Sequence, residues 1–261
     1  MSELVLVERQ SPLMIITINR PEARNAVNGP TSRALAEAFR EFESDPELSV
    51  AILTGAGGNF CAGADLKAVA SNDPDWMNPI HEEGDGPMGP SRMSLSKPVI
   101  AAVSGYCVAG GLELAAWCDM RVADETAVFG VFCRRFGVPL IDGGTVRLPR
   151  LIGMSHAMDM ILTGRAVDAR EAREMGLANR LVAQGQALQG AVDLARDLAR
   201  FPQTCLRNDR FSALAQWGMS EEQAIAAEFR GGKATLNSGE TLSGAGRFAG
   251  GEGKHGQFSR D

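Results

Sequence analysis

Hydrophobic positions in the first third of the chain follow the pattern of strands and then of a helix. Two stretches rich in Val, Ile and Leu, residues 4–8 and 14–19, are separated by Ser11-Pro12 and predict a β-hairpin. From Pro30 onward, apolar side chains recur at i, i+4 and i+7, which is the period of one helix face. The pattern therefore predicts a hairpin followed by an amphipathic helix.

Three shorter apolar runs follow, at residues 50–54, 98–103 and 120–123, and they are typical of buried strands. The first two run into glycine-rich turns. Strand, turn and helix in alternation predict an α/β layered core.

Beyond Gly143 the pattern becomes helical. Ser155 and Asp168 are predicted N-caps, and Gly164 and Gly176 are predicted helix stops. Apolar residues among charges over residues 185–200 indicate an amphipathic helix.

The last part of the chain is also predicted to be helical. Ser220 and Gln223 form a capping-box pattern before an Ala-rich stretch. We therefore divide the chain into a core over residues 1–194 and a C-terminal helical region over residues 195–261 that packs on another subunit.

Residues 71–94 differ from their surroundings, because acidic residues, prolines and glycines gather there and predict a mobile loop. Gly84, Gly86 and Gly89 match the GxGxxG pattern of dinucleotide sites. No strand is predicted before this pattern and Pro87 lies within it, so we reject a dinucleotide site.

Composition and charge exclude several functional classes. No apolar run is long enough to span a membrane. The segment of residues 1–10 contains acidic residues and does not resemble a secretion signal. The formal net charge of -6 argues against a nucleic-acid partner but leaves room for a phosphorylated ligand. The five cysteines lack metal-ligand spacing, which is typical of reduced thiols in a cytoplasmic protein. The three histidines are isolated from one another, so we expect neither a metal site nor a Ser-His-Asp triad.

Candidate chemistry lies in two glycine-rich turns, residues 61–66 and 107–113. Small residues there would let a ligand approach the main chain, and the free N–H groups of a helix starting at each turn would point outward. Two such groups converging on one point could bind an oxygen that gains negative charge. The alternative is that the small residues merely pack a helix against a sheet.

Taken together, several ordered segments resemble those of the crotonase, or enoyl-CoA hydratase/isomerase, superfamily, over roughly residues 3–260. The segments that carry the resemblance are residues 19–26, 60–66, 97–106, 110–114, 118–119, 143–145, 147–149, 162–164 and 172–182.

The resemblance implies a crotonase-like α/β fold, a spiral of repeated ββα units with a C-terminal helical region. It also implies assembly into a homotrimer or a dimer of trimers. By this resemblance the amides of Ala64 and Gly110 form the oxyanion hole for a thioester carbonyl.

The same resemblance implies an acyl-CoA substrate and no separate cofactor, since coenzyme A is part of the substrate. The positions that fall where the family binds coenzyme A are Arg24, Ala62, Asp65, Leu66 and Lys67, with Lys254 and Phe258 as additions that could come from a neighbouring subunit. For the exposed basic residues, the alternative is a solvated surface.

Hydration in this family resembles the work of two glutamates around one water. Glu113 falls at the first position, where the alternative is an acid on a helix surface, and Cys133 falls at the second. A neutral thiol is a poor base for orienting water. Asp142 is a possible replacement, since some family isomerases carry a catalytic Asp in this loop; the alternative is an N-cap for the helix starting near Gly144. For Cys133 we favour simple packing.

The acyl pocket is expected to include the loop at residues 71–94 and four side chains that carry aromatic rings or a thiol. These are Trp117, Phe132, Cys133 and Phe136. The pair Arg134-Arg135 could face solvent or a subunit interface.

Three functions remain open on the sequence. The first is an enoyl-CoA hydratase that adds water to 2-enoyl-CoA thioesters, as in fatty-acid β-oxidation. The second is an enoyl-CoA isomerase that shifts a double bond by a proton shuttle through Glu113 or Asp142. The third is a weakly active acyl-CoA-binding member of the family.

Overall fold

The computed structural model describes residues 3–253, which divide into two compact units with the boundary between Leu198 and Ala199. The first unit holds two β-sheets and the cavity discussed below. The second unit is helical. No helix of residues 3–253 is both long and apolar enough to cross a membrane.

The main sheet of the first unit has six strands in the order β1-β2-β3-β4-β6-β9. Their bounds are β1 Val5–Gln10, β2 Leu13–Ile18, β3 Val50–Gly55, β4 Val99–Val103, β6 Met120–Asp124 and β9 Arg180–Val182. The strands β1 and β2 pair antiparallel around Ser11-Pro12, as the sequence predicted, and the remaining neighbours pair parallel. The central parallel strands β3 and β4 are almost completely buried, which explains why they appear as continuous apolar runs, whereas the edge strand β9 is largely exposed.

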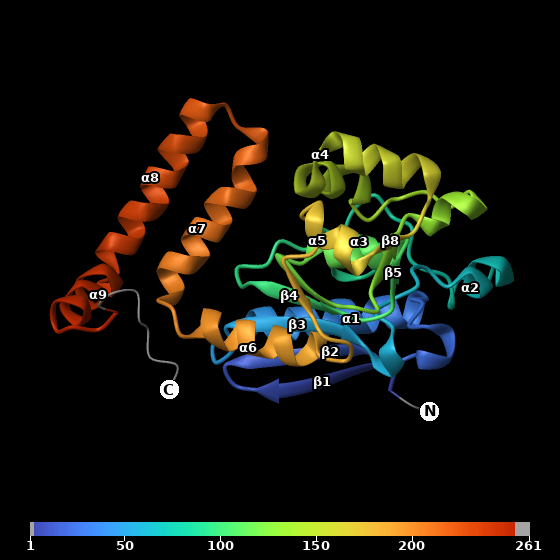
Figure 1. The fold of residues 1–261 in the computed structure, drawn as a ribbon, viewed down its shortest axis with the longest axis horizontal. Helices are drawn as coiled ribbons and strands as arrows, with labels where there is room; N and C mark the ends of the chain where they lie inside the picture. The colour runs from blue at the N-terminus through green and yellow to red at the C-terminus, as the bar shows by residue number, and fades with distance from the viewer. Residues whose placement is uncertain (1–2, 254–261) are drawn as a thin grey trace. The chain divides into compact units, whose positions relative to one another are not determined.

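A second sheet has three strands in the order β5-β7-β8. Their bounds are β5 Tyr106–Val108, β7 Val128–Gly130 and β8 Val167–Asp168. Figure 1 shows this smaller sheet above the main one, with the helices α3, α4 and α5 around it. The bounds of these helices are α3 Gly110–Trp117, α4 Gly144–Thr163 and α5 Ala169–Glu174.

The other helices of this unit are α1 Gly29–Ser44, α2 Leu66–Ser71 and α6 Ala187–Ala199. Four short 3-10 helices complete it, at η1 Pro21–Ala23, η2 Ala56–Gly58, η3 Pro90–Arg92 and η4 Phe132–Phe136. The predicted face of α1 is buried, with Leu35, Phe39 and Phe42 inaccessible to solvent. Burying each such side chain stabilises the fold by roughly 1.5–3 kcal/mol.

Most predicted helix ends are confirmed. Asp168 caps α5 by accepting from the Glu171 amide, and Gly164 is the left-handed C-cap of α4. Gly176 follows the last residues of α5 with a positive φ. The prediction for Ser155 is confirmed only in part: α4 extends across this residue, but the backbone of Gly153, two residues earlier, is non-helical and divides α4 into two helical segments, so the second segment begins close to Ser155.

The loop from α2 to β4 contains the predicted irregular segment, with only η3 as regular structure. Gly84, Gly86 and Gly89 lie in this loop and not between a strand and an α-helix, which agrees with rejecting a dinucleotide site. Parts of the loop are well packed, since Asn78, Met88 and Ser91 are buried.

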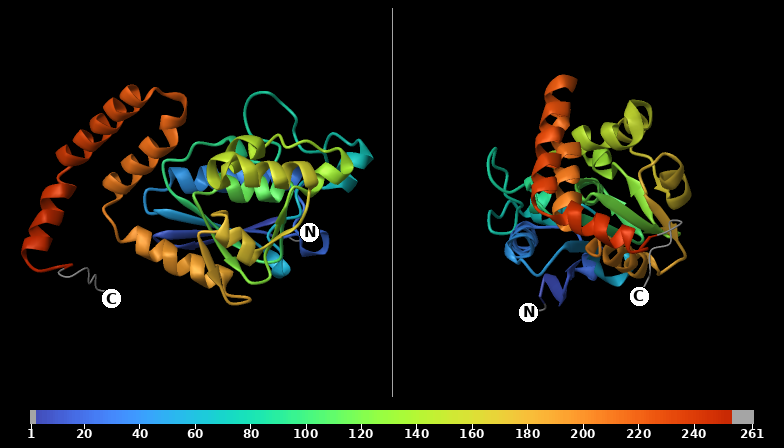
Figure 2. Two further views of the ribbon diagram at one scale, coloured as in Figure 1. Left: turned by 45° about the horizontal axis from the view of Figure 1, so that its top comes forward. Right: turned by 90° about the vertical axis from the view of Figure 1, so that its left-hand side faces the viewer.

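The second unit consists of α7 Gln203–Ala215, η5 Gln216–Gly218, α8 Glu221–Asn237 and α9 Glu240–Ala249. The capping box of Ser220 and Gln223 is present at the start of α8. The Glu240 carboxylate accepts from the amides of Thr204 and Cys205 and so caps α7. Among the helical residues of this unit only Thr235 is buried. Figure 2 shows the succession of these helices from two further sides.

Candidate active site

The two glycine-rich turns lie against each other. Cys61 pairs with Cys107 as an isolated parallel bridge, and the Cys61 carbonyl accepts from the Val108 amide at 3.0 Å. Gly63 has a φ of 96°, and a Cβ on it would lie 2.9 Å from the Gly110 nitrogen. Only glycine therefore fits at residue 63, because of both its backbone conformation and the closeness of the second turn.

Packing explains one glycine of the second turn, but it does not explain the two amides predicted as donors. A Cβ on Gly111 would overlap the Cys61 carbonyl, so this glycine permits helix packing. Val27 donates to the Gly63 carbonyl and accepts from the Asp65 amide, so the N–H of Ala64 between them is directed away from Val27. The Gly110 amide lies at the start of α3, where an N–H has no partner within the helix. Across residues 3–253, neither the Ala64 nor the Gly110 amide donates to a protein acceptor.

Both amides belong to residues that line one cavity of about 470 Å³. Most of its wall is apolar, with a few polar groups, which is typical of sites that bind small molecules. The predicted site residues in its wall are Ala62, Ala64, Leu66, Gly110, Glu113, Phe132, Cys133, Phe136 and Asp142. The structure thus brings together residues from α2, α3, η4 and the loop before α4.

Glu113, in the first turn of α3, is 2% exposed, so it is not an acid on a helix surface. Its Oε1 accepts from the amides of Asp142 at 2.9 Å and Gly144 at 2.8 Å. Burial, together with the nearby Asp142 carboxylate, raises the pKa of Glu113 to about 7, although the two amide donors oppose the shift. A carboxyl group with this pKa can both accept and donate a proton near neutral pH.

Asp142 is also buried, and its Oδ1 accepts from the Met88 amide at 3.0 Å and from the Ser91 hydroxyl. The alternative that Asp142 caps α4 is wrong, because the N-cap residue is Gly143 and no side chain caps this helix. Burial raises the pKa of Asp142, while the hydrogen bond from Ser91 acts in the opposite direction. This carboxylate is therefore bound to Met88, in the loop before η3, and to Ser91, in η3, and not to the start of α4.

Each carboxylate has one oxygen held in place and a second oxygen that remains open. In the part of the chain that the structure describes, neither Glu113 Oε2 nor Asp142 Oδ2 has a hydrogen-bond partner, and neither atom is completely enclosed. Both residues line the cavity, so these second oxygens are the ones that a bound molecule can reach.

Cys133 lies in η4 and is buried in the cavity wall. Burial, and after it the negative charge of Glu113, raises the pKa of the Cys133 thiol. The thiol is therefore neutral near pH 7, and it neither replaces a carboxylate nor acts as a thiolate nucleophile. This agrees with the interpretation that Cys133 packs.

Arg147 and Ser91 are components of the site that the sequence did not reveal. Arg147 donates to the carbonyls of Asp142 at 2.7 Å and Ser91 at 2.8 Å, and so joins the two loops. The segment around Arg147 carried part of the family resemblance, but no local pattern links it to Ser91.

The predicted coenzyme A residues fall into two groups. Arg24 and Lys67 are exposed, and the Arg24 guanidinium lies 4.9 Å from the centre of the Tyr106 ring. The Asp65 side chain is buried, caps α2 and forms an ion pair with Arg20 at 2.8 Å. Although burial opposes the shift, the hydrogen bond from Arg20 lowers the pKa of Asp65. The Asp65 side chain is therefore engaged within the protein, and the assignment of Asp65 to the coenzyme A site stays a prediction.

Two further predicted coenzyme A contacts, Lys254 and Phe258, lie outside the described residues. The prediction for Trp117 is wrong, because this residue is not part of the cavity wall. Its indole N–H donates to the Met93 carbonyl at 3.0 Å and its ring packs against Phe39. Trp117 lies four residues after Glu113, at the end of α3, and its contact with Phe39 directs its ring toward α1.

The pair Arg134-Arg135 binds the end of α4. Arg134 donates to the Ile161 carbonyl, and Arg135 donates to the Gly164 carbonyl at 2.7 Å. The Arg135 guanidinium also lies 3.9 Å from the centre of the Phe132 ring. Positive side chains are favourable at a helix C-terminus, so this pair fixes η4 and with it Cys133 and Phe132.

Comparisons with known proteins relate the whole chain to one family. The family model described as enoyl-CoA hydratase/isomerase matches residues 8–257. The chain is 44% identical to enoyl-CoA hydratase EchA19 of Mycobacterium tuberculosis over 73% of this chain and 72% of that protein. It is 41% identical to a carnitinyl-CoA dehydratase of Salmonella typhi over 76% of this chain and 75% of that protein.

A solved structure shows the same similarity. The crystal structure of an enoyl-CoA hydratase from Mycobacterium tuberculosis H37Rv superimposes with a TM-score of 0.88, at 39% identity, over 94% of this chain and 95% of that one.

Proposed function

The chain belongs to the enoyl-CoA hydratase/isomerase family, and from this premise we propose that it is an enoyl-CoA hydratase, a lyase that adds water to 2-enoyl-CoA thioesters. One observation carries the proposal. A buried carboxyl group, Glu113, has a pKa of about 7 in the same cavity that Ala64 and Gly110 line with two amides free to donate.

The main-chain amides act on the thioester. Water adds at C3 of a 2-enoyl thioester while negative charge accumulates on the carbonyl oxygen. Donors placed in advance around that oxygen stabilise the charge without reorganisation, and each one is worth about 2.7–4 kcal/mol in the transition state. We assign this role to the Ala64 and Gly110 amides.

The carboxylates move the protons. Glu113 in its ionised form accepts a proton from the attacking water through Oε2, while Oε1 stays fixed by its two amide donors. The proton that ends on C2 comes from the same pair of acids. Asp142, with its open Oδ2, takes the place that the neutral Cys133 thiol leaves without a carboxylate.

The neutral thiol also favours a second candidate, an enoyl-CoA isomerase. One carboxylate can carry a proton from C4 to C2, so the absence of a second glutamate at Cys133 harms isomerisation less than hydration. The enolate and the oxyanion hole are the same in both reactions.

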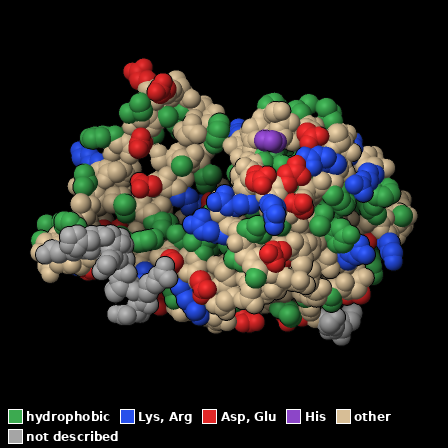
Figure 3. All heavy atoms as spheres, in the orientation of Figure 1, with side chains coloured by type: hydrophobic (Ala, Val, Ile, Leu, Met, Phe, Trp, Pro, Cys, Tyr) green, Lys and Arg blue, Asp and Glu red, His purple; other side chains and the backbone are tan. Residues whose placement is uncertain are grey.

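We further propose that Arg24 and Lys67 bind the phosphates of coenzyme A and that the protein assembles as a homotrimer or a dimer of trimers. The second unit supports the assembly, because nearly all apolar side chains of its helices are exposed, among them Phe211, Phe229 and Leu242. Figure 3 shows apolar side chains along the visible face of these helices. The free cysteines, four of them buried, support a cytoplasmic location.

Two parallel incubations test the function. The protein is mixed with a 2-trans-enoyl-CoA in one and with a 3-enoyl-CoA in the other, and the ultraviolet absorption of the conjugated thioester is followed. A hydratase removes conjugation and forms 3-hydroxyacyl-CoA, whereas an isomerase creates conjugation from the 3-enoyl substrate. Absence of both reactions, with binding of acyl-CoA retained, would leave only the weakly active binding protein.

A further inference from the structure

The direction of the Ala64 amide is set by its neighbours in the bridge to Val27. The Val27 amide donates to the Gly63 carbonyl at 2.8 Å, and the Val27 carbonyl accepts from the Asp65 amide at 2.9 Å. These two bonds hold the peptide groups on either side of Ala64. Any displacement of Val27 would therefore rotate the Ala64 N–H relative to the Gly110 N–H.

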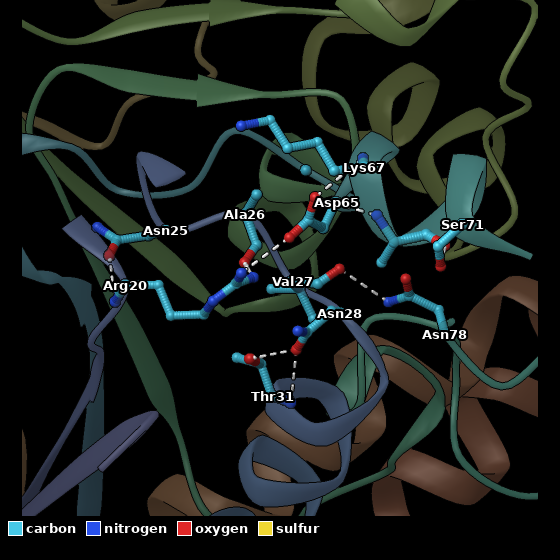
Figure 4. Close-up of polar contacts among 12 residues, drawn as sticks. Arg20, Asn25, Ala26, Val27, Asn28, Thr31, Asp65, Lys67, Ser71 and Asn78 are labelled. Carbon is cyan, nitrogen blue, oxygen red and sulfur yellow. Dashed lines mark hydrogen bonds and ion pairs between the residues drawn. The ribbon is translucent and has the colours of Figure 1, made fainter. Parts of the chain in front are cut away.

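A buried side-chain network holds the segment that contains Val27, as Figure 4 shows. Arg20 donates to the Ala26 carbonyl at 2.5 Å and pairs with Asp65 at 2.8 Å. Asn78, from the loop after α2, donates through its Nδ2 to the Val27 carbonyl at 3.0 Å. Two side chains thus hold this segment: Arg20 binds the carbonyl of Ala26, the residue before Val27, and Asn78 binds the carbonyl of Val27 itself.

Asn78 is the member of this network that also borders the cavity. Its Nδ2 donates both to the Val27 carbonyl and to the Pro87 carbonyl at 2.8 Å, so the amide nitrogen is used completely. Because both neighbours are carbonyl oxygens, which can only accept, the atom that faces them must be the amide nitrogen of Asn78. The residue is 7% exposed.

The oxygen of the same side-chain amide lacks a hydrogen-bond donor. Asn78 Oδ1 is fully buried and has no hydrogen-bond partner among the described residues. Leaving a buried acceptor without a donor is unfavourable, and an apolar side chain of similar volume would avoid this cost. The two donated bonds are therefore what an asparagine contributes at this place, and one of them acts on the residue that orients Ala64.

We propose that Asn78 is a positioning residue for the oxyanion hole. It fixes the Val27 carbonyl, and through the bridge of Val27 it fixes the direction in which the Ala64 N–H meets the thioester oxygen. Asn78 does not itself touch the reacting atoms. The inference rests on the proposed function, because it requires that Ala64 bind the carbonyl oxygen of an acyl-CoA.

The test replaces Asn78 by leucine, which is similar in volume and cannot donate. A saturated acyl-CoA, isotope-labelled at its thioester carbonyl, is bound to the protein, and the carbonyl stretching frequency is measured by difference infrared spectroscopy. We expect the downshift of this frequency to be smaller in Asn78→Leu than in the unaltered protein. We also expect kcat for 2-enoyl-CoA to fall about tenfold, less than the 10²–10³-fold loss on removing a donor, with KM nearly unchanged.

Asn28→Ala is the matched control. Asn28 is a buried asparagine of the same segment, and its side-chain Oδ1 accepts from the Thr31 amide and hydroxyl, whereas the side chain that donates to the Val27 carbonyl is Asn78. It should lower the melting temperature but leave the carbonyl frequency and kcat as they are. Should Asn78→Leu fail to fold, Asn78→Ser takes its place, since a hydroxyl can still donate to one carbonyl. For Asn78→Ser we expect a carbonyl frequency and a kcat between those of the unaltered protein and those expected for Asn78→Leu.

An unchanged carbonyl frequency in the folded Asn78 variant would overturn the inference, whether or not kcat fell. Equal losses of kcat in Asn78→Leu and Asn28→Ala would also overturn it, because the effect would then follow stability alone. If the unaltered protein neither shifts the carbonyl frequency nor turns over an enoyl-CoA, the proposed function itself fails, which is a distinct result.

Discussion

The two walls of the cavity are built on different principles. The amide wall, formed by Ala64 and Gly110, presents main-chain N–H groups from two touching glycine turns. The carboxylate wall, formed by Glu113, Cys133 and Asp142, presents side chains from three separate elements. The arrangement of the amide wall depends on shape, since no added atom fits between its two turns. The properties of the carboxylate wall depend on the charge and burial of its side chains.

This difference shows how one fold can support several reactions. A wall made of main-chain amides serves any thioester that forms an enolate, and its sequence can hardly vary because only glycine fits at residue 63. In the function proposed above, the carboxylate wall decides where protons come from and go to. Here it holds a thiol in one place and a buried Asp142, fixed by Ser91 and Met88, in another. We therefore expect the choice of reaction to be decided mainly on the carboxylate wall.

The largest effect should come from removing the acid of that wall. In Glu113→Gln the amide oxygen can still accept from the Asp142 and Gly144 amides, but no proton can be transferred. We expect kcat for hydration to fall about 10³-fold, within the range for loss of a general acid–base group. Loss of ultraviolet absorption of a 2-enoyl-CoA measures it, and activity equal to that of the unaltered protein would remove Glu113 from the mechanism.

Thermal unfolding shows whether Glu113→Gln remains folded. The pKa of Glu113 is raised from 4.5 to about 7 in the folded protein, so its contribution to stability is present below pH 4.5 and is lost as pH rises through 7. A glutamine side chain does not titrate, so it adds no such pH dependence to the stability. The variant should therefore unfold at a higher temperature than the unaltered protein at pH 8, and this advantage should shrink towards pH 5.

The next largest effect should come from the amide wall. The Cβ of Gly63→Ala would press on the Gly110 nitrogen and the Ala109 side chain, forcing the two turns apart. We expect kcat to fall about 100-fold, comparable to the loss of one oxyanion donor.

Gly58→Ala is the control for the strain of the substitution. Gly58 also has a positive φ, of 78°, but a Cβ there meets no atom within 4 Å. Both variants carry a conformational cost of about 1–2 kcal/mol. If their kcat values agree, the closeness of the two turns has no part in catalysis.

A smaller effect is expected from Asp142→Asn, which can keep the oxygen that accepts from Met88 and Ser91 but loses the charge. We expect hydration to slow about tenfold, less than for the group that itself accepts the proton. Isomerisation of a 3-enoyl-CoA, if present, should be affected less, and a larger loss there would favour Asp142 as the shuttle of an isomerase.

The same variant changes the pH dependence in a defined direction. Glu113 accepts a proton only when ionised, so kcat/KM of the unaltered protein should fall as pH drops below about 7. The Asp142 charge raises the pKa of Glu113, and its removal should move this decline to lower pH. A decline that stays in place or moves upward would show that the two carboxylates do not interact as described.

The smallest effect should be at Cys133. Because the thiol pKa is raised and the group is neutral, Cys133→Ala should change kcat by about twofold or less. A large loss, measured in the same absorption assay, would mean that the thiol takes part in the reaction, and the carboxylate wall would need a third active member.

Much of the fold could be predicted from the sequence because it is encoded locally. The hairpin, the buried face of α1 and the capping box of Ser220 depend on residues within a few positions of one another. The two glycine turns were also recognisable, because a strand that runs into small residues is a local signal. The order of the segments then identified the family, and with it Glu113.

The tertiary structure alone decided what the buried polar side chains do. Asp142 was open between a catalytic acid and a helix cap, and only its contacts with Met88 and Ser91 exclude the cap. Asp65 is bound to Arg20, Trp117 faces Phe39, and Asn78 holds Val27, each across a large separation in the chain. A hydrogen bond between residues far apart in the chain produces neither a periodic pattern nor a compositional bias in either segment. The sequence therefore determines which groups are present, while folding determines which of them meet.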